Sequence, residues 1–225
     1  MIITEAKPQK EILEKLSGFK KIFIFGCGTC ATKCATGGEN EVKELILLLE
    51  KAGKKIAGWA VIESPCDNRL VKKTLREFQK ELARTGAALV LACGAGVQNL
   101  AENLKIPVTA GLNSLFLGKI KNLRHFEEAC GFCEECLLEE TAGVCIFTSC
   151  PKKLLNGPCG GSEDGKCEVN PEIDCVWTII YEKLAGDQAA GGPARLAGGQ
   201  NSKLWEIKKP RNLSKTISPR CVTKK

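Results

Sequence analysis

Cysteine is the residue that most constrains this chain: fourteen cysteines stand against a single histidine, His125, in 225 residues. In a reducing compartment, so many thiols indicate metal or redox chemistry rather than a disulfide framework. With one histidine, a metal site must be built almost entirely from thiolates. That donor set favours iron–sulfur clusters or four-cysteine zinc sites over mixed-ligand zinc, copper or catalytic histidine chemistry.

The chain shows no signal for secretion, membrane insertion or nucleic-acid binding. No run approaches 18 consecutive apolar residues, and the charged start, MIITEAKPQK, lacks the apolar core of a signal peptide. We therefore expect a cytoplasmic protein without a membrane span. The net charge of +7 arises in residues 186–225, which carry nine basic and two acidic residues. The rest is formally neutral, so a nucleic-acid face has no compositional support.

The cysteines divide the chain into three parts. Five precede residue 100, eight lie between Cys130 and Cys175, and Cys221 stands in the tail. We predict an α/β domain over residues 1–124, a cysteine-rich metal-binding domain over 125–185, and a Gly/Ala-rich linker with an extended basic tail over 186–225. The middle part lacks long periodic segments except for a closing helix at 176–185, so its order should depend on bound metal.

The first part has the pattern of an open α/β sheet. Four short apolar runs without polar alternation predict parallel strands that are buried on both faces. Stripes of apolar residues at helical spacing lie between the runs. This alternation predicts a small open parallel sheet of about four strands, of the flavodoxin or Rossmann type. The four runs are Lys21–Cys27, Lys55–Ile62, Ala87–Cys93 and Ile106–Gly111.

Thiols follow three of these predicted strands. Cys27, Cys30 and Cys34 follow the first strand, Cys66 follows the second, and Cys93 ends the third. Because the carboxyl ends of parallel strands border one crevice, three chain segments should bring their thiols together. A four-iron cluster needs four thiolates. We predict Cys30, Cys34, Cys66 and Cys93 as its ligands, with Cys27 as the alternate, since a strand-ending cysteine can also pack in the core.

The loop after the first strand also permits two other interpretations. Gly26, Gly28 and Ala31 fit a G-x-G-x-x-A dinucleotide pattern, with Glu63 placed as a ribose-binding acid, although this motif alone is weak. The Cys-x-x-Cys pair of the same loop fits a redox-active dithiol. Such a dithiol needs its first cysteine at a helix N-terminus with few neighbouring thiols.

The second part opens with a ferredoxin-like spacing at Cys130, Cys133 and Cys136. In bacterial ferredoxins a Cys-Pro completes such a run, and Cys150-Pro151 occurs here, but further along the chain than in that pattern. A zinc ribbon would need a second C-x₂-C knuckle, which is missing. Eight thiols can hold two four-ligand sites or one cluster with bystanders, so their grouping stays open. The other candidate ligands are Cys145, Cys150, Cys159, Cys167 and Cys175.

Two stretches of the sequence resemble a known family. The run from ETAGVC to YEKL, with its NGPCGG string, is similar to the C-terminal cysteine-rich domain associated with methylenetetrahydrofolate reductases. The strings CGTCATKC, ESPCD and LACGAG resemble the small iron–sulfur subunit of the MetV type, found in acetogenic bacteria. The resemblance covers about residues 20 to 185 and leaves out the tail.

The resemblance implies a non-catalytic accessory subunit of an oxidoreductase. Its partner is a MetF-type flavoprotein, a (β/α)₈ barrel that holds FMN and carries the hydride chemistry. The implied role is electron transfer through one to three [4Fe–4S] clusters, between a further iron–sulfur or NADH-linked donor subunit and the FMN of the partner, in the methyl branch of the Wood–Ljungdahl pathway. The alternatives are a zinc-stabilised scaffold subunit of the same reductase, or iron–sulfur in the first domain with zinc in the second.

Overall fold

The computed structural model describes residues 1–134, 136–155 and 157–189. Contacts divide the chain into two compact units, Met1–Glu128 (unit 1) and Ala129–Lys225 (unit 2). The sequence-based expectations for the tail, including Cys221, lie outside the described residues from residue 190 onward. Within the described ranges, no helix combines the length and apolar character that crossing a bilayer requires.

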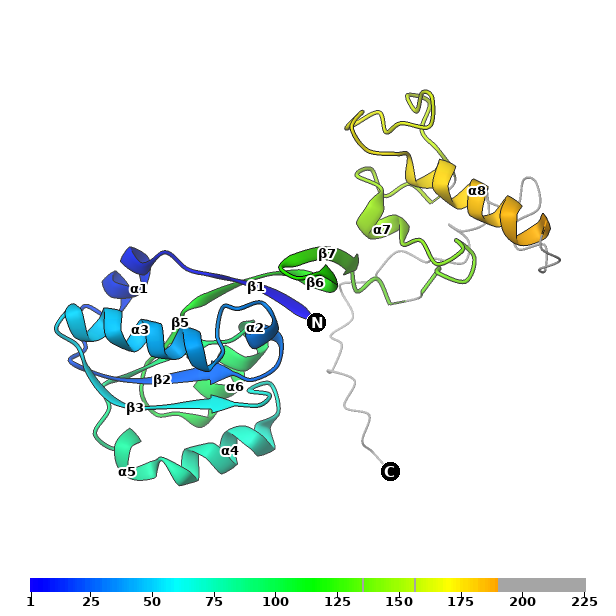
Figure 1. The fold of residues 1–225 in the computed structure, drawn as a ribbon. Coiled ribbons are helices and arrows are strands. Elements are labelled where there is room, and N and C mark those ends of the chain that lie inside the picture. Colours follow the sequence, from blue (N-terminus) through cyan, green and yellow to red (C-terminus); the bar gives the residue numbers. More distant parts are fainter. Residues whose placement is uncertain (135, 156, 190–225) are drawn as a thin grey trace, which may run out of the picture. The chain divides into compact units, whose positions relative to one another are not determined.

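Unit 1 is built on a parallel sheet of four strands (Figure 1), in the order β3-β2-β4-β5. The two central strands are apolar and buried almost throughout, because helices cover both faces of the sheet. The parallel four-stranded sheet predicted from the apolar runs is confirmed. Its strands are β2 (Lys21–Cys27), β3 (Lys55–Ile62), β4 (Ala87–Leu91) and β5 (Val108–Ala110).

Helices connect the strands, and two of them begin at positions capped by a side chain. Before the longest helix of unit 1, the backbone N–H of Gly38 donates to Glu41 Oε2 at 2.8 Å. Before the next, the carboxylate of Asp67 accepts from the backbone N–H of Arg69 at 2.8 Å. The helices are α1 (Gln9–Lys15), α2 (Cys30–Lys33), α3 (Glu39–Lys51), α4 (Asn68–Glu77), α5 (Gln79–Leu82) and α6 (Gly94–Asn103).

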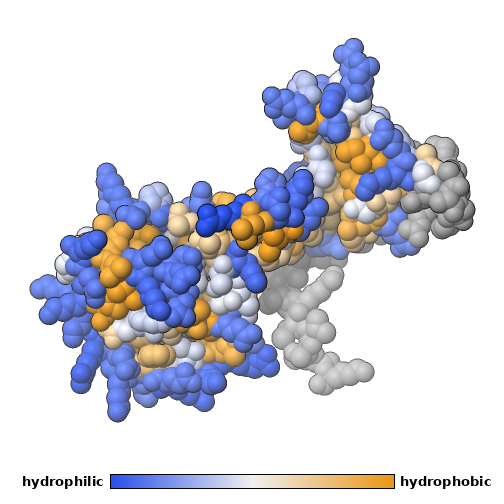
Figure 2. Space-filling model, viewed as in Figure 1, coloured by the Kyte–Doolittle hydropathy of each residue, from blue (hydrophilic) through white to orange (hydrophobic). Residues whose placement is uncertain are grey.

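A second, three-stranded sheet in the order β1-β6-β7 was not expected from the sequence. Strand β1 (Ile2–Ala6) pairs antiparallel with β6 (Leu112–Asn122), and β7 (His125–Cys130) follows after a two-residue turn. Only Leu112 and Gly118 of β6 are buried, so the strand has little of the apolar alternation by which a half-buried strand is recognised. Leu123, in the turn, is 93% exposed. Figure 2 shows apolar patches between hydrophilic residues on the viewed surface.

Unit 2 has little regular structure. Its helices are α7 (Ile146–Ser149) and α8 (Val176–Ala189), which contains the predicted closing helix, and isolated bridges pair Lys166 with Glu163 and Asp174. A small core surrounds Trp177, whose Nε1 donates to the carbonyl of Leu154 at 2.9 Å. The buried members of this core are Leu137, Ile146, Cys175, Val176, Trp177, Ile180 and Leu184.

Candidate metal centres

The thirteen cysteines in the described part of the chain form no disulfide. Most of them gather in three groups of four thiols, one in unit 1 and two in unit 2. In the described ranges, no three Cys, His, Asp or Glu side chains stand close enough to hold an ion as they are arranged. The candidate centres are therefore groups of thiols that share a space, not completed coordination shells.

The first group lies at the carboxyl ends of the unit 1 strands. The chain runs from β2 to β3 on one side and returns with β4 on the other side of β2. This reversal of strand order creates a switch point at the ends of β2 and β4, where ligands of open α/β sheets bind. Cys27 ends β2, and Cys93 follows β4 as the N-cap of α6. The fold thus delivers thiols to its usual ligand site.

The electrostatics of Cys66 show which thiols are its neighbours. Partial desolvation raises the pKa of the Cys66 thiol even though the residue is exposed, and negative charge on Cys93, Cys27 and Cys30 raises it further. Repulsion of this kind requires that Cys93, Cys27 and Cys30 each lie within electrostatic range of Cys66. We call Cys27, Cys30, Cys66 and Cys93 the sheet-edge group.

The sulfur of Cys34 is directed toward β1, where it lies 3.8 Å from the backbone carbonyl oxygen of Ile2. Cys27 is 4% exposed, and its Sγ lies 3.5 Å from Thr29 Oγ1. Between Cys34 and the alternate Cys27, the geometry favours Cys27 as the fourth ligand. The ligand set itself stays a prediction.

The structure bears on the two other interpretations of this loop. The glycine pattern leads into α2, a helix of four residues, and the N–H of Gly28 donates to Ile62 O at 2.8 Å. A pyrophosphate-binding turn would need free N–H groups at the start of a longer helix. Cys27 is a buried residue at the end of β2 and not at a helix N-terminus, and it lies within electrostatic range of Cys66, so the surroundings of a reactive dithiol are missing as well.

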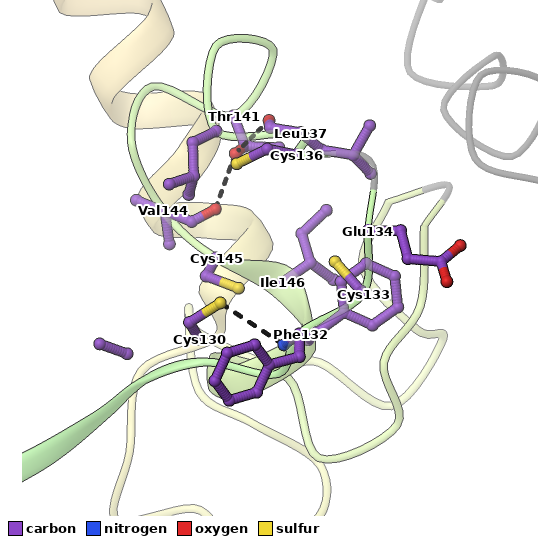
Figure 3. A pocket seen from close by; sticks show the side chains of 13 residues that line it. Cys130, Phe132, Cys133, Glu134, Cys136, Leu137, Thr141, Val144, Cys145 and Ile146 are labelled. Carbon is purple, nitrogen blue, oxygen red and sulfur yellow. Dashed lines mark hydrogen bonds between the residues drawn. The ribbon is translucent and has the colours of Figure 1, made fainter. Parts of the chain in front are cut away.

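The second group surrounds a cavity of about 410 Å³ in unit 2. Cys130 ends β7, Cys133 and Cys136 lie in the following loop, and Cys145 stands directly before α7. In the view of Figure 3 the side chains of Cys130 and Cys145 extend toward the same side, and both residues line the cavity. We call these four residues the Cys130 group. The other side chains that line the cavity are mostly apolar, among them Phe132, Leu137, Leu138, Val144, Ile146 and Phe147.

Backbone contacts hold the loop of the Cys130 group in place. The N–H of Phe132 donates to Cys130 Sγ at 3.4 Å. The buried hydroxyl of Thr141 bridges Leu137 O at 2.8 Å and Val144 O at 2.7 Å, and so closes the turn before Cys145. An N–H donor to sulfur and apolar walls suit a thiolate-bound cluster, since the donor stabilises its negative charge and the walls limit access of water.

The third group lines a much smaller cavity of about 20 Å³, also in unit 2. We call its members, Cys150, Cys159, Cys167 and Cys175, the Cys150 group. Cys175 is the residue before α8, where desolvation raises its pKa but hydrogen bonds from Ser162, Thr178 and Trp177 lower it by more. A thiol that is stabilised as thiolate at a helix N-terminus has the form that ligates metal.

The eight cysteines of unit 2 therefore divide in chain order, four and four. The sequence leaves this grouping open, and its ferredoxin-like spacing allows Cys150-Pro151 to complete the run that begins at Cys130. In the structure Cys145 lines the cavity of the Cys130 group, and Cys150 lines the other one. The order of the cysteines along the chain is the sequence signal that could have predicted this division, because neighbouring loops of an irregular domain tend to close local sites.

Comparison with known proteins gives one match. Residues 109–202 match the family model described as "Methylene-tetrahydrofolate reductase C terminal". No curated protein and no solved structure matches the chain. The matched segment covers less than half of the chain but contains both thiol groups of unit 2. The cysteine-rich part of this chain is thus similar to the C-terminal domain of methylenetetrahydrofolate reductases.

Proposed function

We propose that this chain is the electron-transfer iron–sulfur subunit of a cytoplasmic methylenetetrahydrofolate reductase complex, acting in the methyl branch of the Wood–Ljungdahl pathway. The observation that carries the proposal is the gathering of Cys27, Cys30, Cys66 and Cys93 from three chain segments at the switch point of the sheet. The similarity of residues 109–202 to the reductase domain supports the choice of complex.

Thiolates of two groups would hold the clusters. The sheet-edge group and the Cys130 group each supply four cysteines, the number that a [4Fe–4S] cluster requires. A bound cluster supplies one-electron transfer at a potential set by burial and hydrogen bonds. The residues around the thiols have supporting roles: the Phe132 N–H stabilises negative charge on Cys130, and apolar side chains such as Leu137 limit water.

The hydride chemistry would belong to a partner. In unit 1 the parallel sheet has four strands, half the number of a (β/α)₈ barrel. A MetF-type flavoprotein would hold FMN and the folate substrate, and a further iron–sulfur or NADH-linked subunit would donate electrons. This chain would then link the donor to the flavin without being a complete enzyme.

Metal analysis of anaerobically purified protein tests the proposal. The protein should be brown and contain iron and acid-labile sulfide in equal amounts, about eight of each per chain for two clusters. Dithionite reduction should produce a low-temperature EPR signal, and the reduced protein should reduce the FMN of the partner. A colourless preparation that contains only zinc would instead support the alternative, a zinc-stabilised scaffold subunit of the same reductase.

A pair of matched variants tests the sheet-edge group. Cys66→Ser should lower the iron content by about four per chain, because it removes one ligand of a four-thiolate site. Cys34→Ser should keep full iron content, because its sulfur is directed at Ile2 O. Equal iron content in Cys66→Ser and the unmodified protein would refute this ligand set.

A further inference from the structure

We infer that the Cys150 group binds a single Zn²⁺ ion in tetrahedral coordination, in a site separate from that of the Cys130 group. The inference goes beyond the proposed function, because zinc has no redox chemistry and such an ion would carry no electron. Its role would be structural, namely to fix the loops between α7 and α8.

The size of the two cavities distinguishes their occupants. About 10 to 15 Å³ of cavity volume is enough for one water molecule. The cavity of the Cys150 group, about 20 Å³, thus has the size of one small guest, and its four thiols would have to close in to reach bonding distance of an ion. The cavity of the Cys130 group, about 410 Å³, has room for a cluster of several atoms. Both are lined by four thiols, so volume rather than donor type separates a single ion from a cubane cluster.

Backbone hydrogen bonds order the chain at each thiol of the Cys150 group: two thiols lie at turns, and two flank the antiparallel bridge between Lys166 and Asp174. The carbonyls of Cys150 and Cys159 accept from the N–H groups three residues later, at 3.0 and 3.1 Å. The N–H of Cys167 donates to Ile173 O at 3.0 Å, and that of Cys175 to Gly165 O at 2.6 Å. Anchored segments of this kind are how small domains surround a structural ion with cysteines from different loops.

Gly157 fixes the approach to Cys159. Its φ of +110° is a backbone conformation that side-chain-bearing residues rarely adopt, and only the hydroxyl of Tyr181 lies near the position of a β-carbon. The glycine of the NGPCGG string thus directs the chain into the turn that carries Cys159.

Positive charge stands beside the site. Four thiolates around one divalent ion leave two net negative charges. Lys152 lines the cavity, and its ammonium pairs with Glu168 at 2.6 Å. The N-terminus of α8, at Cys175, adds the partial positive charge of a fourteen-residue helix.

Unit 2 needs such an ion for its stability. Among its described residues the core has seven buried members, and Cys175 is one of them. The thiols do not stand close enough together to hold an ion as they are arranged. The segments that carry Cys159 and Cys167 contain only isolated bridges, so small shifts of these segments would let the thiols close around the ion. On binding, each thiol still protonated releases its proton to solvent, and no oxidation state changes.

Two cysteine variants of the full chain, purified anaerobically, test the inference. Cys167→Ser should lose about one zinc per chain and keep all its iron. The matched control Cys145→Ser, in the Cys130 group, should lose about four irons and keep its zinc. Zinc and iron are measured by plasma mass spectrometry and sulfide by colorimetry. Loss of iron from Cys167→Ser, or of zinc from Cys145→Ser, would overturn the separation of the two sites.

A measurement on the unmodified protein keeps the test valid if a variant fails to fold. A mercurial that attacks thiolates should release about one zinc per chain, detected with a chromogenic chelator. Cobalt(II) in place of zinc should give the intense visible bands of a tetrahedral thiolate site. Protein with full iron content but no zinc would refute this site and leave the proposed electron transfer intact. Protein with zinc but no iron would support this site and refute the proposed electron transfer.

Discussion

Replacement of Gly37 by alanine should destabilise unit 1 and disturb the sheet-edge group. Gly37 is buried at the end of the loop that carries Cys30, and its carbonyl accepts from the N–H of Cys27 at 2.8 Å. A β-carbon at residue 37 would lie 2.9 Å from the β-carbons of Ala31 and Leu91, and closer still to the Leu91 carbonyl oxygen. The absent side chain lets this loop lie directly against β4.

The cost of the substitution follows from what must move. Real β-carbons essentially never approach other atoms within 3.0 Å, and the neighbours here are backbone and β-carbons that cannot rotate away. Overpacking of this kind costs about 1–3 kcal/mol. With a urea m-value of about 2 kcal/mol/M, the unfolding midpoint of unit 1 should fall by about 0.5–1.5 M.

Gly18→Ala is the matched control, because a β-carbon at residue 18 meets no atom within 4 Å. It should leave the midpoint unchanged or raise it slightly, since alanine reduces the entropy of the unfolded chain. Urea titrations of both variants, followed by circular dichroism, measure the difference, and iron content reports whether the loop at Cys30 has moved. Equal midpoints for Gly37→Ala and the unmodified protein would refute the packing argument.

Three further changes test single interactions. Lys54→Met removes three hydrogen bonds, of 2.7 to 3.1 Å, from the Lys54 Nζ to carbonyls after α1. Chemical denaturation should show that the free energy of unfolding falls by about 1–2 kcal/mol. The control Lys73→Met, at an exposed lysine, should leave it almost unchanged. Hydrogen bonds from two lysines of β6 hold the pKa of Glu127 below its ordinary 4.5. The ionised carboxylate therefore stabilises the folded protein above that pH, and this contribution is lost as the pH falls below it. Glu127→Gln should flatten the decrease in thermal midpoint measured between pH 5 and 3. Trp177→Phe breaks the bond to Leu154 O, and near-ultraviolet circular dichroism should report a loss of about 1–3 kcal/mol in unit 2.

The parallel sheet of unit 1 was predictable because its strands are short, apolar and buried on both faces. Such runs stand out from the amphipathic helices between them, and the structure places β2 and β3 at the predicted residues, with β4 and β5 inside the predicted runs. Strands β1 and β6 were missed because their pairing is antiparallel and largely exposed, and depends on contact between residues more than a hundred positions apart. Local pattern does not contain that information.

The thiol groups show the same division between local and distant information. The sequence predicts that thiols after three parallel strands share one edge, because sheet geometry requires it. It predicts Cys34 as the fourth ligand with Cys27 as the alternate, but that choice depends on which side of the loop each sulfur faces, which the sequence pattern does not contain. Cys34 faces Ile2, a residue of the unpredicted β1. In unit 2, spacing alone left eight equivalent thiols, and only their cavities separate them.

These two kinds of site should respond differently to removal of metal. The thiols of the sheet-edge group are brought together by a sheet whose core includes Phe23, Phe25 and Leu89, all fully buried, so unit 1 should stay folded without metal. The Cys150 group joins loops that have only isolated bridges, so its segment should lose order. Hydrogen exchange after metal removal should keep the amides of β2 and β4 protected while those of residues 157–175 exchange freely. Unchanged protection across 157–175 would contradict the role assigned to metal in unit 2, and loss of protection in β2 would contradict the independence of unit 1.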